Sequence, residues 1–288
     1  MTGPARGFKR MIVGLPQSMI DLAAVDAAAD LAEFLNIELL ATFVADSSLH
    51  ALAGFPRARE LRIVEQGWQA IDLEQITRDL EQATSAARRR FAESVRSRAI
   101  KTSFDVIAGT EAMTSLIRAD DIVAIIEPSH PGERITRQFA GLLDAALAAA
   151  GAVLILPRRL ARTTGPVMAI ADGGAEAGIG IALEIAVALK EDLVVATQRG
   201  APLPAELLAR AHDLGVRIEQ IRAGGSIAAA AMPTPVLSQV RERLRVVTRS
   251  QVPDDAARLF TGLQGVPLLV VEPDRLELGG RPPHAATA

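Results

Sequence analysis

Short runs of apolar residues alternate along the whole chain with longer stretches in which apolar residues recur every three or four positions. The short runs are apolar on both faces, which is typical of parallel strands covered by helices on either side. The longer stretches have the spacing of the helices that would cover them. This alternation predicts an α/β protein built from βαβ units around parallel sheets.

The same order of strands and helices occurs twice. Each half has five expected strands, which are 11–15, 38–44, 102–107, 122–126 and 153–156 in the first half and 166–171, 192–197, 216–221, 244–248 and 267–271 in the second. An internal duplication accounts for this repetition. It predicts two five-stranded parallel-sheet α/β domains, at 9–157 and 166–273, followed by a disordered tail at 274–288.

The two predicted domains differ most between their second and third strands. There the first domain has an irregular stretch, 47–68, and then a long amphipathic helix that is expected over 69–98. The second domain has only 198–215 at this place, and a further helix is expected later, over 236–243. The far side of the long helix is basic and is interpreted as a solvated face, consisting of Arg88, Arg89, Arg90, Arg96 and Arg98.

Composition excludes several classes of chemistry. The 288 residues include no cysteine, which removes disulfides, thiolate catalysis and cysteine-ligated metals. Aromatic residues make up 3% of the chain and its formal net charge is −3, so neither base stacking nor charge points to a nucleic-acid partner. The longest uncharged apolar run, 145–157, is shorter than the roughly 18 residues that a membrane span needs. Since the N-terminus has no signal-peptide pattern, we expect a cytoplasmic protein with no membrane partner.

Short motifs follow several of the predicted strands. Pro16 and Ser18 come after the first strand, and Asp-Gly-Gly at 172–174 comes after the first strand of the second domain. Gly-Thr-Glu-Ala at 109–112 follows a third strand, and Thr-Arg-Ser at 248–250 follows a fourth. In these motifs and in its tandem pattern the chain resembles the universal stress proteins over nearly its whole length. In that family an aspartate and a nearby serine end the first strand; this chain has Pro16 in place of that aspartate in the first domain, keeps Ser18, and has the acid as Asp172 in the second domain. Gly-Asp-Pro-Ala and Gly-Ser/Thr-Arg-Gly turns follow the family's third and fourth strands.

The resemblance implies a fold of the adenine-nucleotide-alpha-hydrolase-like type for each domain. It also implies a contact between the domains, because the fifth strands of the family commonly pair across a dimer. Strands 153–156 and 268–271 would then pair within this chain and make the two domains an intramolecular pseudo-dimer. A homodimer or a separate protein partner stays open beside this contact.

A nucleotide site in the second domain is a further implication of the resemblance. There, Asp172, Gly173, Gly174, Thr248 and Arg249 would hold ATP or AMP. However, ATP-binding members carry Gly-x2-Gly-x9-Gly-Ser/Thr after the fourth strand, and its glycines let backbone N–H groups reach the phosphates. Neither domain has this loop, so nucleotide binding is doubtful and no cofactor is assigned. Without a ligand, the aspartate would be a turn or cap residue and the two glycines a tight turn.

A candidate anion site lies in the loop after the fourth strand of the first domain. Ser129, His130, Gly132 and Arg134 share this loop, and their side chains could hold a phosphate or a carboxylate. Catalysis is not predicted, because a serine and a histidine that are adjacent in sequence seldom face each other. The two prolines of the loop favour a rigid turn as the other interpretation.

Two pairs of neighbouring acids suggest metal binding at first sight. Asp120 with Asp121, and Asp254 with Asp255, lie at element boundaries, where acids cap or terminate helices. The four histidines are scattered, and none stands at metal-ligand spacing from either pair. No metal site is predicted.

The sequence therefore favours a binding or regulatory protein of the stress response that is not an enzyme. Two other functions stay open. One is a nucleotide-binding protein with weak ATPase activity. The other is a scaffold that docks a protein partner through the helix at 69–98.

Overall fold

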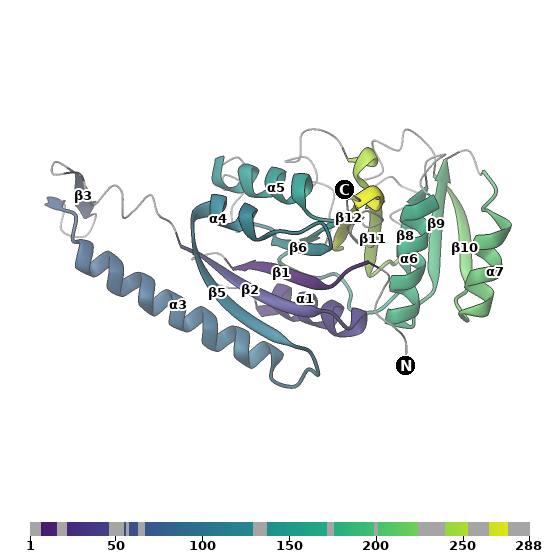
Figure 1. Cartoon of the computed structure of the whole chain (residues 1–288), viewed down its shortest axis with the longest axis horizontal. Coiled ribbons are helices and arrows are strands. Elements are labelled where there is room, and N and C mark those ends of the chain that lie inside the picture. The colour runs from purple at the N-terminus through teal and green to yellow at the C-terminus, as the bar shows by residue number, and fades with distance from the viewer. Residues whose placement is uncertain are drawn as a thin grey trace, which may run out of the picture.

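The computed structural model describes residues 7–15, 22–45, 55, 58–62, 67–128, 137–171, 176–198, 201–223, 240–252 and 265–275. Within these residues it is an α/β protein with one ten-stranded sheet and helices on both faces of that sheet (Figure 1). The strands are β1 (Arg10–Leu15), β2 (Glu38–Ala45), β5 (Thr102–Ala108), β6 (Asp121–Ile126), β7 (Ala152–Leu156), β8 (Val167–Ala171), β9 (Leu193–Gln198), β10 (Ile218–Ala223), β11 (Leu244–Thr248) and β12 (Leu268–Val271). The helices are α1 (Leu22–Leu35), α3 (Leu73–Val95), α4 (Gly109–Leu116), α5 (Arg137–Ala149), α6 (Glu176–Leu189) and α7 (Ala205–Asp213).

The sheet runs without a break through both halves of the chain. From one edge to the other its order is β10-β9-β8-β11-β12-β7-β6-β1-β2-β5. Neighbouring strands are parallel except β7 and β12, which are antiparallel, with Leu268 opposite Ile155 and Val271 opposite Ala152. The two strands that were expected to pair are therefore hydrogen-bonded neighbours. Outward from them, both sides follow the same order, which is the fifth, fourth, first, second and third strand of that half.

Each face of the sheet buries its own layer of apolar side chains. On one face the core includes Ala28 of α1, Phe91 of α3 and Ile185 of α6. On the other face it includes Met113 of α4 and Leu143 of α5. Strand β7 is buried along its whole length and β6 in all but its last residue, because helices cover both faces, as their uninterrupted apolar sequences predict.

A half-buried ion pair joins β1 to β6 at the amino end of the sheet. Arg10 Nε donates to Asp121 Oδ1 at 3.0 Å, and Arg10 Nη2 donates to Asp121 Oδ2 at 2.6 Å. The same nitrogen donates to the carbonyl of Leu116 at the end of α4, and the Arg118 amide donates to Asp121 Oδ2. The hydrogen bond with Asp121 raises the pKa of Arg10 above its ordinary value. Asp121, expected as a cap or terminator, thus connects two strands and a helix end.

Three local expectations need correction. The stretch 47–68, expected to be irregular, contains an antiparallel hairpin of β3 (Arg59–Arg62) and β4 (Gly67–Ala70). These strands are short and polar, so they have no apolar periodicity to predict them. Among the described residues, α3 begins only at Leu73, because the Asp72 carboxylate accepts a hydrogen bond from the Gln75 amide at 3.1 Å and caps the helix there.

The third correction concerns the end of the helix expected over 236–243. Its first four residues lie outside the described residues, and 240–243 are not helical. The Arg243 amide donates to the carbonyl of Pro166 at 3.1 Å, and Glu242 accepts a hydrogen bond from the Arg245 side chain of β11 at 2.5 Å. At this point the backbone is therefore already hydrogen-bonded to the residue before β8, just as β11 itself is paired with β8.

We predict that the two neighbouring acids Asp120 and Asp121 differ sharply in their contribution to stability. Asp121→Ala leaves the half-buried Arg10 guanidinium without its carboxylate and should lower the free energy of unfolding by about 3 kcal/mol. The matched control is Asp120→Ala, which removes an ion pair with Lys9, whose side chain is 73% exposed. That loss should stay below about 1 kcal/mol. Urea unfolding measures both, and equal losses would contradict the prediction.

Candidate functional site

The strand order reverses between β8 and β11, because the chain continues from β8 to β9 on one side while β11 lies on the other. Open α/β sheets have their ligand crevice at the carboxyl ends of the strands at such a point. Asp172, Gly173 and Gly174 follow β8 directly, and they lie outside the described residues. Thr248 and Arg249 are described, so the geometry of the predicted site is known on its β11 side.

Thr248 ends β11 and begins a short turn that folds back onto β8. Its amide donates to Gln251 Oε1 at 2.8 Å, and Gln251 Nε2 donates to the carbonyl of Ile170 in β8 at 3.0 Å. The hydroxyls of Thr248 and Ser250 form a further hydrogen bond at 3.0 Å. Thr248 and Gln251 are both buried. The Gln251 side chain is thus hydrogen-bonded to one backbone group of β8 and one of β11 near their carboxyl ends.

Gln251 is a residue that the sequence analysis missed. A threonine followed three residues later by a glutamine has the spacing of a capping box, which is the signal that could have found it. Its contact with Ile170 spans 81 positions of sequence and could not be predicted from that spacing. The structure brings Thr248 and Arg249 to the same turn, where Thr248 is buried and Arg249 is half-buried. Their predicted part in nucleotide binding stays a prediction.

Helix α6 approaches the end of β11 very closely at Gly178. A Cβ built on this glycine would lie 2.7 Å from Thr248 Cγ2, closer than such atoms approach in proteins. A Cβ built on Gly180, two residues further along α6, would meet only Arg210 Nη1, at 4.0 Å. Gly178 therefore permits the contact between helix and strand, whereas nothing restricts Gly180 in this way.

Strand β2 of the first half carries one unusual polar group. Thr42 of β2 is fully buried, and its hydroxyl has no hydrogen-bond partner among the described residues. It stands opposite Gly14 of β1, where a Cβ would meet no atom within 4 Å. A single hydroxyl beside a small open space could bind one polar atom, but it is not a phosphate site. Ser129, His130, Gly132 and Arg134, the candidate anion site of this half, lie outside the described residues.

Two kinds of feature are absent from the part of the chain that the structure describes. No group of three or more histidines, aspartates and glutamates there could hold a metal ion. None of the helices in that part combines the length and the apolar character that crossing a membrane requires.

The β3–β4 hairpin and the N-terminal part of helix α3 extend away from the body of the molecule beyond strand β5 (Figure 1). We call the hairpin together with residues 73–86 of α3 the arm. The C-terminal part of α3 packs on the body, where Ala87 and Phe91 are buried and the Phe91 ring lies 6.2 Å from that of Phe104 in β5. In contrast, Leu73 at the start of α3 is 46% exposed.

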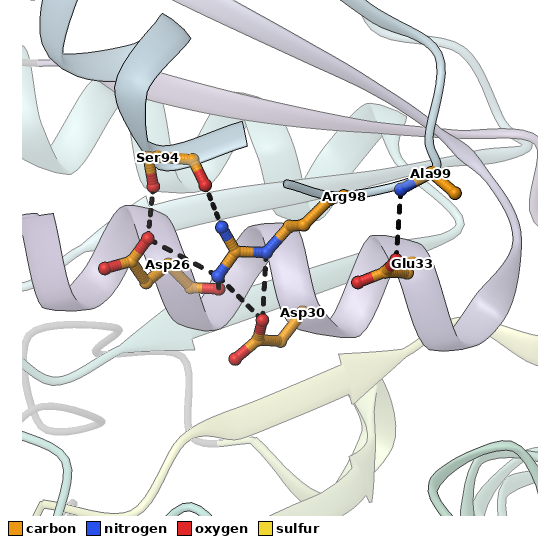
Figure 2. A network of polar contacts seen from close by, with 6 residues as sticks. All are labelled: Asp26, Asp30, Glu33, Ser94, Arg98 and Ala99. Carbon is orange, nitrogen blue, oxygen red and sulfur yellow. Dashed lines mark hydrogen bonds and ion pairs between the residues drawn. The ribbon is translucent and has the colours of Figure 1, made fainter. Parts of the chain in front are cut away.

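A network of polar contacts fastens the C-terminal end of α3 to α1 (Figure 2). Arg98 Nε and Nη2 donate to Asp30 Oδ1 at 2.9 and 2.7 Å, and Nη1 donates to the carbonyl of Ser94. The Ser94 hydroxyl donates to Asp26, and the Ala99 amide donates to Glu33 at 3.1 Å. Three acids of α1 thus hold the segment that follows α3.

The contacts of Arg98 correct one interpretation made from the sequence. Arg98 was assigned to the solvated basic face, yet its side chain is 13% exposed and bound to α1. Arg88 also has a partner, since its guanidinium lies 4.9 Å from the centre of the Phe104 ring. Arg89, Arg90 and Arg96 are exposed, as expected for that face.

Solved structures of universal stress proteins share this fold. A universal stress protein from Archaeoglobus fulgidus DSM 4304 has a TM-score of 0.60 at 11% identity, covering 91% of this chain and 96% of that one. A putative universal stress protein from Pseudomonas aeruginosa UCBPP-PA14 has a TM-score of 0.52 at 15% identity, covering 96% and 99%. The chain therefore has the α/β fold of the universal stress proteins.

The other comparisons add no finer assignment. A universal stress protein in complex with cAMP is 17% identical and covers 53% of this chain and 98% of that one, with a TM-score of 0.32 that carries no argument. No protein-family model matches the chain. No curated protein matches it either.

We predict opposite effects for alanine at the two glycines of α6. Gly180→Ala should raise the free energy of unfolding by about 0.5–1 kcal/mol, because alanine favours helix and the site has room. Gly178→Ala should lower it by about 1–3 kcal/mol, because the new methyl group overlaps the Thr248 side chain. Adding Thr248→Ser removes that methyl partner and should recover part of the loss. Thermal unfolding measures all three, and a stabilising Gly178→Ala would contradict the prediction.

We also predict that Arg98 and Arg96, two positions apart, contribute differently to stability. Arg98→Ala removes the contacts with Asp30, Asp26 and Ser94 and should lower the free energy of unfolding by about 1–2 kcal/mol, since the acids are partly solvated. Arg96→Ala on the exposed side should change it by less than about 0.5 kcal/mol. Amide hydrogen exchange of 87–98 should rise in the first variant only, and equal protection in both would contradict the assignment.

Proposed function

We propose that this chain is a binding and regulatory protein of the stress response that acts in the cytoplasm by association, without catalytic turnover. The observation that carries this proposal is the turn after β11, which is hydrogen-bonded to β8. There Gln251 takes the Thr248 amide and the Ile170 carbonyl, which are groups that a ligand at this edge would otherwise meet. The absence of the glycine-rich loop from the sequence supports the same conclusion.

A second candidate role, docking of a protein partner through the long helix, is favoured by the arm. The apolar stripe of α3 is buried at Ala87 and Phe91, half-buried at Leu80 and Ala83, which pack against the core, and exposed at Leu73. An apolar surface of this kind on a projecting element is typical of a contact with another protein.

The test is a nucleotide titration of the full chain. ATP or AMP, each with and without Mg²⁺, should leave the midpoint of thermal unfolding unchanged, and phosphate release from ATP should equal that of a protein-free control. A ligand at 100 times its Kd would add about 2.7 kcal/mol of stability, which such a scan detects readily. Asp172→Ala is the control variant. A saturable stabilisation or an ATP turnover that this substitution abolishes would overturn the proposal.

A further inference from the structure

A cavity of about 50 Å³ lies where the two halves of the chain meet, on the face of the sheet that α1 and α6 cover. Residues of the first half, of the second half and of the segment 158–165 that connects them all line it. Its walls are mainly apolar, because leucine makes up half of the lining. These leucines are Leu31 of α1, Leu154 and Leu156 of β7, Leu160 of the connecting segment, Leu189 of α6 and Leu244 of β11.

The connecting segment is fastened to the second half at two points beside this cavity. The Ala161 amide donates to the carbonyl of Gly265 at 2.7 Å, and the Gly165 amide donates to Glu191 Oε1 at 3.0 Å. Gly265 has a φ of +79°, and a Cβ there would lie 3.0 Å from the Ala161 amide nitrogen, so glycine is required at this close approach. Residues 162–163 lie between the two fastened points and line the cavity, which is therefore part of a fixed structure.

Water is a poor occupant of the apolar part of this cavity. A buried water needs two to four polar partners, whereas leucine side chains offer none. Apolar cavities instead stay dry or take apolar molecules, and one of about 150 Å³ in another protein binds benzene. At about a third of that volume, the cavity between the two halves has room for about two or three carbon atoms.

Two charged side chains of the lining already have partners. Asp30 Oδ1 accepts hydrogen bonds from Arg98 Nε and Nη2 at 2.9 and 2.7 Å (Figure 2). Arg243 Nη1 lies 3.5 Å from Glu191 Oε1, and the Arg243 guanidinium lies 5.7 Å from the centre of the Phe34 ring. The charges of Asp30 and Arg243 are therefore compensated within the chain and leave nothing for a ligand to neutralise.

Arg162 and Thr163 are the polar lining residues that remain, and both are exposed. Neither side chain has a hydrogen bond or an ion pair with another described residue. The lining thus has one positive charge that no acid of the described chain compensates, with a hydroxyl beside it. A guanidinium and a hydroxyl both donate hydrogen bonds to a carboxylate, and the charge strengthens the first of these. An anionic head group therefore fits this part of the cavity, whereas a cation does not.

We propose that this cavity binds a short-chain monocarboxylate of three or four carbon atoms, with its tail on the leucines and its carboxylate at Arg162 and Thr163. Leu244 begins β11 and Thr248 ends it, so this site lies at the opposite end of the strand from the predicted nucleotide site. It gives the proposed binding protein a small-molecule ligand of its own. Because both halves line the cavity, the bound acid also stabilises the contact between them.

A titration of the full chain with butyrate, at constant ionic strength, tests the ligand class. With the leucine methyl groups labelled with ¹³C, saturable NMR shifts are expected at Leu154, Leu189 and Leu244, while Leu208 on the surface of α7 should not move. Butan-1-ol and butylamine carry a similar tail without the carboxylate and should bind at least tenfold more weakly. If butyrate gives no saturable shift at the lining leucines, the proposal fails. If the alcohol or the amine binds as tightly, the choice of an anion is overturned.

A pair of arginine variants tests the position of the carboxylate. Arg162→Met keeps most of the side-chain length, removes the charge and should weaken butyrate binding by about tenfold or more. Arg159→Met is the matched control, because Arg159 is an exposed arginine of the same segment that does not belong to the lining. This control should bind butyrate as the wild type does. Equal affinities of the two variants would overturn the role given to Arg162.

A third variant tests the position of the tail. Ala27 of α1 is half-buried and lines the cavity, so Ala27→Leu should fill the space and abolish butyrate binding. Circular dichroism checks that this variant is folded, and a folded Ala27→Leu chain that binds butyrate as tightly as the wild type would overturn the location. A failure of this inference leaves the proposed lack of nucleotide turnover intact, since the nucleotide titration probes the other end of β11.

Discussion

The antiparallel pairing of β7 with β12 is the contact on which the architecture depends. It joins two sets of parallel strands into one sheet and buries both strands completely, with Leu154 opposite Leu269 and Val153 opposite Val270. Each of these strands would otherwise be an edge with unpaired backbone groups, which invites association. Because β7 and β12 pair with each other, the edge strands that remain in the described sheet are β5 and β10.

The sheet order also decides where the predicted ligand site and the arm lie. Near the carboxyl ends of β8 and β11, Gln251 is hydrogen-bonded to one backbone group of each strand, the Ile170 carbonyl and the Thr248 amide. Strand β5 lies at the far edge and carries the base of α3 beside it. The arm projects from this edge of the sheet, and Arg98 with the acids of α1 gives it a fixed base.

The arm also shows how far local pattern can go. The period of Leu73, Ile76 and Leu80 predicts a helix, and the helix is present, because a run of this length with one apolar face has few other stable conformations. Its first residue depends on a cap formed by Asp72, which was not anticipated. The hairpin before it gives no periodic signal, because its strands are only four residues long and mostly polar in sequence.

The sequence by itself determined the α/β class and the positions of the ten strands of the sheet, because buried strands require uninterrupted apolar runs. The pairing of the fifth strands followed from the resemblance to the universal stress proteins. Only the tertiary structure decided which polar residues meet. Arg10 with Asp121, Gln251 with Ile170 and Arg98 with Asp30 are separated by 111, 81 and 68 positions. The sequence does not distinguish a charged or amide side chain that lies in solvent from one that lies in a buried network. Its partner is therefore known only from the folded structure.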